Sequence, residues 1–242
     1  MLRALILAGG YGTRIKEHTD TIPKPLVKAN DIPLFIHIIN LYKIYGVKNV
    51  TILAGFKIES FYKYCEKNFL TVDKIQHQYL INNEVNIDIL DTGLGTMTGG
   101  RILQALDVYK DKEYFLTYGD GVSDVNIKNL YSYHSSKNSV ATVTAVRPPA
   151  RFGSLNIENG KVTKFAEKHH TSEGWINGGF FVIKDEVKNY IENNNNTIFE
   201  KEPLEKLAEF GELSAYEHNG FWQPVDTIRD LERLEEALIK NG

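Results

Sequence analysis

The sequence predicts an α/β fold in which a doubly wound, mostly parallel sheet carries helices on both faces. Throughout the first 150 residues, apolar runs of strand length alternate with segments whose apolar residues recur at helical spacing, an order typical of parallel sheets. The apolar runs do not alternate with polar residues, as expected for strands buried on both faces. The chain has 242 residues, 42% of them hydrophobic, which suffices for one domain with a substantial core.

The elements of the first part follow from these patterns in chain order. We expect strands at 3–8, 49–55, 74–81, 85–91, 113–120 and 139–146, and helices at 33–46, 58–69, 99–110 and 125–136. Gly46 comes directly after the apolar residues of the 33–46 segment and is expected to close that helix. The alternation of strands and helices predicts a Rossmann-like sheet.

The pattern changes after residue 150. Asn159-Gly160 lies between two segments of alternating polarity, which predicts a hairpin with a type I′ turn. A strand at 175–183, helices at 186–192 and 199–210, a strand at 212–218 and a last helix at 227–241 follow. We expect this smaller portion of strands and helices to extend the same sheet and to shape the second half of one cleft.

The composition excludes several classes of protein. A net charge of -3 argues against a protein devoted to nucleic acid, which would carry a basic face. The single cysteine, Cys65, rules out an internal disulfide and suits the cytosol, and we expect it to be buried. No apolar run approaches the roughly 20 residues that cross a membrane, and no signal peptide is evident. We therefore expect a soluble, cytoplasmic protein without nucleic-acid or membrane partners.

Three glycines follow the first predicted strand, in the stretch "LILAGGYGTR". Backbone N–H groups can hold a phosphate chain only where side chains do not block a close approach, and Gly9, Gly10 and Gly12 allow that approach. The carboxyl end of a strand is also where open α/β sheets bind ligands. Ile15 breaks the dinucleotide-binding glycine pattern, and no Gly-Lys-Ser/Thr triplet of a Walker loop occurs. The alternative is a plain glycine turn.

Two cations follow the glycines and argue against a plain turn. Arg14 offers a fork of donors, and Lys24 lies between Pro23 and Pro25, which restrict the backbone on both sides of it. Two cations and a loop rich in N–H donors suit a triphosphate.

Two aspartates are candidate ligands of a divalent ion. Asp120 ends a predicted strand between two glycines in "YGDG", and Asp226 precedes the last helix in "FWQPVDT". Magnesium is held by one or two carboxylates together with substrate phosphates and water. The alternatives are a solvated loop residue for Asp120 and a helix N-cap for Asp226.

These motifs together resemble those of the sugar nucleotidyltransferase family. "LILAGGYGTR…PKPLV", "DTGLGTMTGGR", "YGDGV", "RPPARFGSLNI", "EK", "WINGGFFV" and "GFWQPVDTIRD" occur in the family's order and spacing over nearly the whole chain. "TMTGGR" and "GFWQPVDT" resemble the cytidylyl branch. The resemblance implies a magnesium-dependent in-line attack of a sugar 1-phosphate, expected to be α-D-glucose 1-phosphate, on CTP, giving a CDP-sugar and pyrophosphate. It also implies a homo-oligomer. We expect one domain over 1–242, with 1–150 binding the nucleotide and 151–242 the sugar.

The resemblance also implies the residues of the site. The nucleotide would be bound by Leu7, Gly9, Gly10, Thr13, Arg14, Lys24, Thr98, Gly99, Gly100 and Arg101, with the last four facing the base. The sugar phosphate would be bound by Gly153, Glu167, Lys168 and Asn177, and magnesium by Asp120 and Asp226. Arg14, Lys24, Asp120 and Asp226 would carry catalysis. The alternatives are a helix-surface position for Arg101, a solvated position for Lys168 and a turn amide for Asn177.

The chain departs from the family at two places that bear on the acceptor. It has "EKHH" at 167–170 where relatives read "EKP", and the segment between 70 and 91 is shorter than in the glucose enzymes. Two other classes of function remain. A glycosyltransferase would normally carry a D-x-D motif, which the sequence lacks. A silent sugar-nucleotide-binding module would tend to lose the aspartates or lysines that are present here.

Overall fold

The computed structural model describes residues 2–10, 22–148, 154–158, 160–166 and 174–241. The strands are β1 (Arg3–Leu7), β2 (Lys28–Ala29), β3 (Ile32–Pro33), β4 (Asn49–Ala54), β5 (Leu70–Asp73), β6 (Gln78–Ile81), β7 (Val85–Asp91), β8 (Glu113–Tyr118), β9 (Gly121–Ser123), β10 (Ala141–Val146), β11 (Ser154–Glu158), β12 (Lys161–Ala166), β13 (Ile176–Asn177), β14 (Phe181–Lys184), β15 (Leu213–His218) and β16 (Trp222–Pro224). The α-helices are α2 (Leu34–Ile44), α3 (Ile58–Asn68), α4 (Thr98–Tyr109), α5 (Ile127–Lys137), α6 (Glu202–Glu209) and α7 (Ile228–Asn241), and the 3₁₀ helices are η2 (Lys24–Leu26) and η3 (Asp185–Tyr190).

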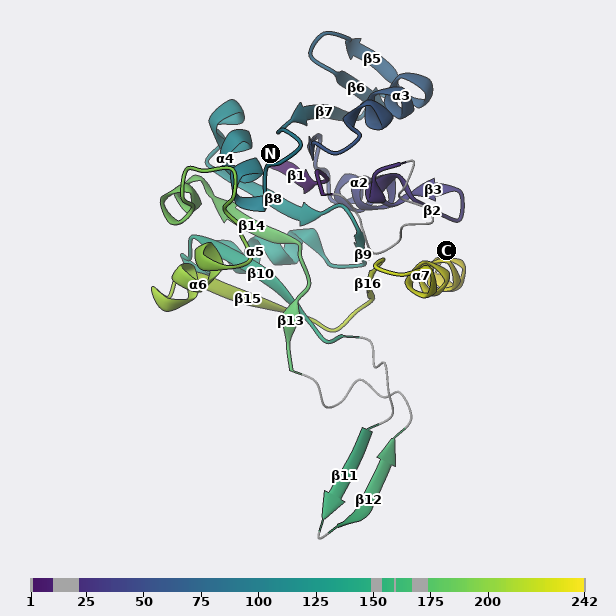
Figure 1. Ribbon diagram of the computed structural model, residues 1–242, viewed down its shortest axis with the longest axis vertical. Coiled ribbons are helices and arrows are strands. Elements are labelled where there is room, and N and C mark those ends of the chain that lie inside the picture. Colours follow the sequence, from purple (N-terminus) through teal and green to yellow (C-terminus); the bar gives the residue numbers. More distant parts are fainter. Residues whose placement is uncertain (1, 11–21, 149–153, 159, 167–173, 242) are drawn as a thin grey trace.

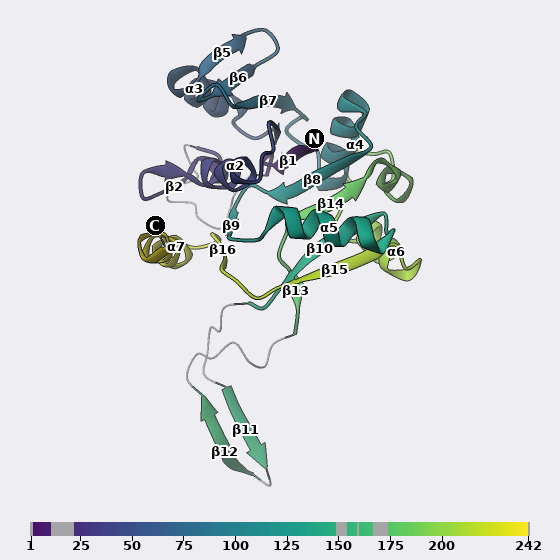
Figure 2. The same ribbon diagram turned by 180° about the vertical axis from the view of Figure 1, so that it is seen from behind.

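The main sheet confirms the predicted fold class (Figure 1; Figure 2 shows the reverse side). Its centre is parallel, with β1 between β4 and β8 and with β7 beside β4. Antiparallel strands β6 and β5 extend one side, and β14 and β10 extend the other, where β15 runs parallel to β10. The chain therefore continues from β1 to β4 on one side and returns to β8 on the other. The carboxyl ends of β1 and β8 form a switch point, the place where such sheets bind ligands.

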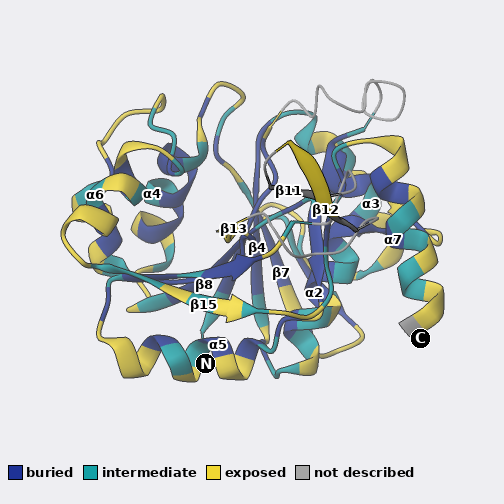
Figure 3. Ribbon diagram, turned by 90° about the horizontal axis from the view of Figure 1, so that it is seen from below, coloured by how far each residue is buried: buried dark blue, intermediate teal, exposed yellow. Residues whose placement is uncertain are grey.

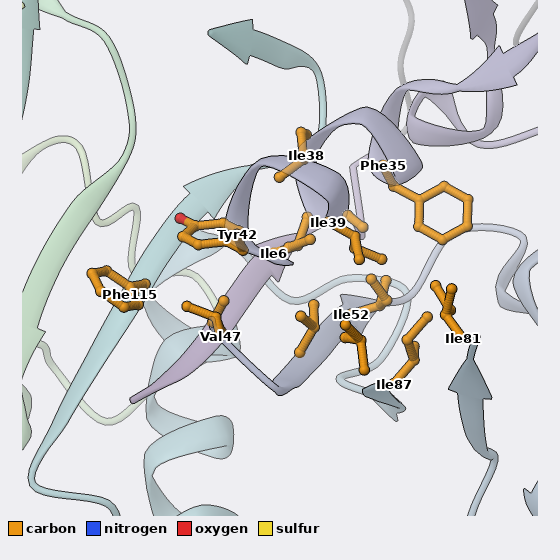
Figure 4. Packing of buried hydrophobic residues seen from close by; sticks show 14 of the residues in the cluster. Ile6, Phe35, Ile38, Ile39, Tyr42, Val47, Ile52, Ile81, Ile87 and Phe115 are labelled. Carbon is orange, nitrogen blue, oxygen red and sulfur yellow. The ribbon is translucent and has the colours of Figure 1, made fainter. Parts of the chain in front are cut away.

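Helices cover both faces of this sheet because successive residues of each strand point to opposite sides. Ala4 and Ile6 of β1 belong to a core that includes buried residues of α2, α3 and α5. Figure 4 shows Ile39 of α2 beside Ile6 and Ile52, and Phe35 of the same helix on the side of Ile81. Leu5 and Leu7 belong to a second core with α4, η3 and α6. In Figure 3 the buried strands lie between helices whose outer faces are exposed.

A third, smaller core attaches the last helix close to the switch point. Leu231 and Leu234 of α7 pack with Val27, Val122 and Val225, which come from the segments around η2, β9 and β16. β9 and β16 pair antiparallel beside this core. The predicted final helix is confirmed, and its packing places the end of β16 next to the end of β8.

The predicted strand at 175–183 is interrupted. Between Ala145 and Thr142, three steps along β10 correspond to five steps along its partner, from Asn177 to Val182. The two extra residues form a bulge in which Gly179 and Phe180 both have positive φ, 72° and 45°. A bulge of this kind bends a strand and re-aims its side chains. The bulge separates Asn177, which pairs with Ala145, from the ladder that β14 forms with β10.

Other boundaries differ from the predictions because they depend on distant partners. The predicted helix at 186–192 is the 3₁₀ helix η3, and the helix at 199–210 begins only at Glu202. The short strands β2, β3, β5, β9 and β16 were not predicted. The hairpin around Asn159-Gly160 is confirmed as the pair β11 and β12, which extends away from the sheet in both views. Gly160 has a φ of 76°, as a type I′ turn requires, whereas Asn159 lies outside the described residues.

Within the described residues, no helix combines the length and the apolar composition needed to span a bilayer.

Candidate active site

Gly9, the first of the glycines after β1, packs on the buried side chain of Arg101. Arg101 of α4 is only 3% exposed, so it is not a helix-surface residue. It donates hydrogen bonds to the backbone oxygens of Ala54 (2.9 Å) and Gly9 (3.0 Å) and to the hydroxyl of Thr92. A Cβ at position 9 would lie 2.0 Å from Cζ of Arg101, whereas a Cβ at Gly10 would meet nothing within 4 Å. Gly9 is therefore required by packing, and Gly10 leaves open space facing the cavity described below.

Lys24 joins the two candidate metal ligands. Its Nζ lies 2.7 Å from Oδ2 of Asp120 and 2.7 Å from Oδ1 of Asp226, which are 96 and 202 residues away in sequence. The two carboxylate oxygens are thus separated by no more than twice that distance. Burial alone would lower the pKa of Lys24, but the charges and hydrogen bonds of both aspartates reverse this effect and raise the pKa above its ordinary value of 10.5. Lys24 is a full positive charge at neutral pH.

Local structure explains how Lys24, Asp120 and Asp226 are positioned next to one another. Lys24 begins the 3₁₀ helix η2 directly after Pro23, and the residue is buried. Asp120 lies between β8 and β9, and its carbonyl accepts a hydrogen bond from the N–H of Val225 (2.9 Å), which ties it to the segment carrying Asp226. Pairing of β9 with β16 brings these two segments together.

Asp226 is not the N-cap of the last helix. Thr227 and Asp230 form a reciprocal cap: Oγ1 of Thr227 accepts from the N–H of Asp230 (3.2 Å), and Oδ2 of Asp230 accepts from the N–H of Thr227 (3.0 Å). This arrangement corresponds to a capping box with Asp at the third position. Because these two residues satisfy the start of α7, the carboxylate of Asp226 is available to Lys24.

Two cavities meet at this ion pair. The first has a volume of about 340 Å³ and is lined by the glycine turn, Lys24 and the start of α4: Leu7, Gly9, Gly10, Lys24, Thr96, Met97, Thr98, Arg101, Tyr118, Asp120 and Asp226 are among its residues. The second, of about 330 Å³, is lined by residues that include Tyr118, Asp120, Asn177, Glu200, Trp222 and Asp226. Tyr118, Asp120 and Asp226 belong to both. The pair of carboxylates therefore lies where the contents of the two cavities would meet.

The start of α4 forms one wall of the first cavity and is held in place by hydrogen bonds to the segment 197–200. The hydroxyl of Thr98 donates to Oε2 of Glu200 (2.6 Å) and accepts from the N–H of Phe199 (2.9 Å). The N–H of Gly99 donates to the carbonyl of Thr197 (2.9 Å), and a Cβ at Gly99 would approach that oxygen to 2.8 Å. Gly100 is similarly close to the side chain of Thr96. The two glycines let the 194–197 loop pack directly on the helix.

The second cavity is bounded by the bulge between β13 and β14. Nδ2 of Asn177 donates to the hydroxyl of Tyr118 (3.1 Å), while Oδ1 of Asn177 accepts from the N–H of Gly179 (2.8 Å). Nε1 of Trp222 donates to the carbonyl of Gly178 (2.7 Å). The Asn177 side chain is thus a turn amide that also lines the cavity, so the two readings of this residue are compatible.

Some predicted site residues lie outside the described residues. These are Thr13 and Arg14 of the glycine segment, and Gly153, Glu167 and Lys168 of the predicted sugar side, together with His169 and His170. Conversely, sequence reasoning missed Tyr118, Glu200 and Trp222. Tyr118 and Trp222 lie within the quoted motifs "YGDG" and "FWQPVDT", which could have drawn attention to them. Glu200 lies in "IFEKEPL", where nothing marks one glutamate above the others.

The donor set fits a divalent cation. Two carboxylate oxygens already converge on one cationic nitrogen, at the junction of two cavities. Among the described residues no cluster of three or more His, Cys, Asp or Glu side chains could hold a metal. Two carboxylates without further protein ligands are the arrangement by which magnesium binds with substrate phosphates.

Comparison with known proteins identifies the family of this chain. The family model described as nucleotidyl transferase matches residues 3–241. The chain belongs to the nucleotidyl transferase family. It is 43% identical over 244 residues to the glucose-1-phosphate cytidylyltransferase of Salmonella typhi, covering 97% of this chain and 95% of that relative. It is 27% identical over 235 residues to the mannose-1-phosphate guanyltransferase of Yarrowia lipolytica, covering 95% of this chain and 62% of that relative.

The family fold is also present in solved structures. HddC from Yersinia pseudotuberculosis superimposes with a TM-score of 0.71 at 23% identity, covering 98% of this chain and 100% of that one. As a member of the nucleotidyl transferase family, the chain carries the mostly parallel sheet and flanking helices that this comparison shows.

Proposed function

We propose that the chain transfers CMP from CTP to α-D-glucose 1-phosphate, giving CDP-glucose and pyrophosphate. The observation that carries the proposal is the convergence of Lys24, Asp120 and Asp226 between two cavities of similar volume. A transfer between two phosphate esters needs two binding sites with charge neutralisation at their junction. The choice of CTP and glucose 1-phosphate follows the activity named for the Salmonella typhi relative, which is similar over nearly the whole chain.

The chemistry is an in-line displacement. A phosphate oxygen of the sugar 1-phosphate attacks the α-phosphorus of CTP, a new P–O bond forms, and the bond to the β-phosphate oxygen breaks so that pyrophosphate leaves with the electron pair. The nucleophile is already an anion, so no general base has to remove a proton from it. Catalysis of this kind consists of positioning and of charge stabilisation.

The residues divide this task between them. We propose that the first cavity holds the nucleotide, with the glycine turn at the phosphates and the start of α4 at the base, and that the second cavity holds the sugar phosphate. Lys24 supplies a positive charge between them, and its two hydrogen bonds fix the directions of Asp120 and Asp226. Asp120 and Asp226 would hold Mg²⁺, which when bound neutralises phosphate charge and orients the reacting groups. Arg14, Glu167 and Lys168 remain proposed phosphate and sugar contacts.

A substrate matrix tests the function directly. The protein is mixed with Mg²⁺, with each of CTP, UTP, GTP, ATP and dTTP in turn, and with a panel of sugar 1-phosphates, and pyrophosphate release is measured. We expect CTP with glucose 1-phosphate to give the highest kcat/KM. Absence of pyrophosphate with every pair would indicate a non-catalytic binding module. A preference for another nucleotide or acceptor would keep the chemistry but overturn the assigned substrates.

Single substitutions test the assignment of the two aspartates. Asp120→Ala and Asp226→Ala should each lower kcat at least about 100-fold, the scale on which loss of a principal electrostatic stabiliser is felt. Asp107→Ala is a matched control because Asp107 lies on the exposed side of α4. Rates close to that of the unmodified protein in both variants at saturating Mg²⁺ would contradict the assignment.

A further inference from the structure

A chain of hydrogen bonds joins the walls of the two cavities, and Glu200 lies in the middle of this chain. On one side, the N–H of Phe199 donates to the hydroxyl of Thr98 (2.9 Å), which donates to Oε2 of Glu200 (2.6 Å). On the other side, the hydroxyl of Tyr118 forms a hydrogen bond with the carboxylate of Glu200. Thr98 lines the first cavity, Glu200 the second and Tyr118 both. The carboxylate therefore holds side chains of both walls.

The chain continues from Tyr118 to the bulge between β13 and β14. The N–H of Gly179 donates to Oδ1 of Asn177 (2.8 Å), and Nδ2 of Asn177 donates to the hydroxyl of Tyr118 (3.1 Å). Because the N–H of Gly179 holds Oδ1, the NH₂ group is the end of the amide that faces Tyr118. That group has a second N–H, and Asn177 is an exposed residue on the wall of the second cavity. The second N–H is therefore available to a ligand in this cavity.

The direction of every hydrogen bond in this chain depends on the carboxylate. Both ends of the chain are backbone N–H groups, those of Phe199 and Gly179, which can only donate. A carboxylate has no proton to donate, so the hydroxyls of Thr98 and Tyr118 both donate to Glu200. Burial and, after it, the negative charge of Glu200 raise the pKa of Tyr118 above its ordinary value, so the phenol keeps the proton that it donates. The two halves of the chain converge on Glu200, and neither half can reverse.

The composition of the second cavity indicates which group the second N–H of Asn177 meets. Asp120, Glu200 and Asp226 line this cavity, and none of its described lining residues is a lysine, arginine or histidine. A phosphate is therefore expected at Lys24, at the junction of the two cavities, rather than beside Asn177. A sugar hydroxyl can accept a hydrogen bond from an N–H and brings no further negative charge. A hydroxyl group is thus the acceptor that fits this N–H.

We propose that Glu200 and Tyr118 are positioning residues for the acceptor: their hydrogen bonds hold the Asn177 amide so that its second N–H donates to a hydroxyl group of the sugar. The proposal rests on the proposed function, because it concerns the acceptor of the same site. Glu200 and Tyr118 act through Asn177, and neither has to contact the sugar. A donor that is already oriented lowers the cost of ordering side chains on binding. Breaking the chain should therefore weaken binding of the acceptor.

Two substitutions break the chain at different points. Tyr118→Phe keeps the ring but removes the hydroxyl that accepts from Asn177. Glu200→Gln keeps an oxygen for Thr98 but presents an NH₂ group to Tyr118, whose proton then has no acceptor because Asn177 also donates to the same hydroxyl. Each substitution should raise the KM for glucose 1-phosphate about 3- to 10-fold, the range for one neutral hydrogen bond, while the Kd for CTP in calorimetry stays within about 2-fold.

A double-mutant cycle separates positioning from a general loss of structure. Asn177→Ala removes the amide, so adding Tyr118→Phe or Glu200→Gln to it should raise the KM by no more than about 2-fold further. Effects that multiply in the double variants would show that Tyr118 and Glu200 act independently of Asn177 and would overturn the proposal. A KM within about 2-fold of normal in both single variants would overturn it as well. Glu202→Gln is the matched control, because Glu202 is exposed, pairs with Lys206 on the surface of α6 and should change none of these values.

The unmodified protein gives an independent test with CTP and the 2-, 3-, 4- and 6-deoxy analogues of glucose 1-phosphate. At least one analogue should lose about 3- to 10-fold in kcat/KM, and Asn177→Ala should remove that loss. If all analogues are used within about 2-fold of the parent, or if Asn177→Ala leaves every loss in place, the proposal is overturned. If the parent gives no pyrophosphate, the proposed function fails, which is a separate result. The Kd of glucose 1-phosphate in calorimetry then replaces KM in the cycle, and the positioning role is still decided.

Discussion

Lys24→Met tests whether Lys24 and a divalent cation compete for the same two carboxylates. Methionine has nearly the length of lysine, so the substitution removes the charge with little change of packing. In the unmodified protein the ammonium lies 2.7 Å from both carboxylates, and its side chain is 10% exposed. Without it, two negative charges at most twice 2.7 Å apart repel each other by about 1 to 3 kcal/mol for effective dielectric constants between roughly 80 and 20.

The loss of hydrogen bonds adds to this repulsion but is partly offset. Hydrogen bonds to charged groups contribute about 1.5–3 kcal/mol each. Burying the ammonium opposes that gain, and the side chains of Asp120 and Asp226 are 36% and 30% exposed, so water screens them. We expect a net destabilisation of about 2–3 kcal/mol, which for a chain of this size lowers Tm by roughly 4–12 °C.

Calorimetry with and without Mg²⁺, in the absence of nucleotide, measures the effect. In Lys24→Met the cation meets two carboxylates that have lost their contact with the ammonium, and it should reverse at least half of the decrease in Tm. In the unmodified protein it has to displace the ammonium and should raise Tm less. Lys206→Met is the control, because Lys206 forms an exposed pair with Glu202 at 2.6 Å and should respond to neither change. If Mg²⁺ shifts Tm equally in Lys24→Met and in the unmodified protein, the carboxylates do not share a cation site and the reasoning fails.

Three further predictions concern the glycine turn and two buried side chains. Gly9→Ala should destabilise the protein and weaken CTP binding, because the new Cβ would lie 2.0 Å from the side chain of Arg101. Gly10→Ala should keep Tm within about 2 °C and weaken only CTP binding, because its Cβ would meet nothing within 4 Å. Equal Tm values for the two variants would contradict this. Cys65 is fully buried, and burial raises its pKa to about 12, so an aromatic disulfide reagent at pH 8 should label it only after unfolding; rapid labelling of the folded protein would refute its burial. Burial lowers the pKa of His134 below its ordinary 6.5, so the unfolded chain takes up a proton first and stability should fall as the pH drops below about 6.5. His134→Gln should reduce that fall in urea unfolding compared at pH 7.5 and 5.0, and an unchanged pH dependence would show that another group causes it.

The predictions of the structure that were accurate are those that depend on residues close together in sequence. Burial could be predicted from the apolar runs of β1, β4 and β8 and from the amphipathic pattern of α7. In a strand or a helix, the spacing of residues along the element determines which side chains share a face. Lys24 between two prolines, and Asp120 between two glycines, stood out as local patterns that a simple turn does not need. The Asn159-Gly160 hairpin was predictable for the same reason. The assignment of Thr13, Arg14, Gly153, Glu167 and Lys168 to the site, and the division of the domain near residue 150, stay predictions.

Contacts between distant segments were not predictable in this way. For Arg101, the sequence predicted a contact with the base and left a helix-surface position as the alternative. Only packing places its side chain against the carbonyls of Gly9 and Ala54, which are 92 and 47 residues away. The bulge at Gly179 and Phe180 depends on the strand β10 that it faces. Glu200 belongs to no motif, and only the fold brings it beside Thr98 and into the second cavity.

The sequence by itself determined the fold class, the glycine turn and the types of charged group that the site uses, because these are recorded in local spacing and residue type. Only the tertiary structure decided which charges meet. Lys24, Asp120 and Asp226 come from three separate segments, and it is the order of strands around β1, with the packing of α7 on the segments around η2 and β9, that brings their charges within hydrogen-bonding distance. These contacts depend on how all the helices and strands pack to bury their apolar faces, and no single stretch of sequence contains that information.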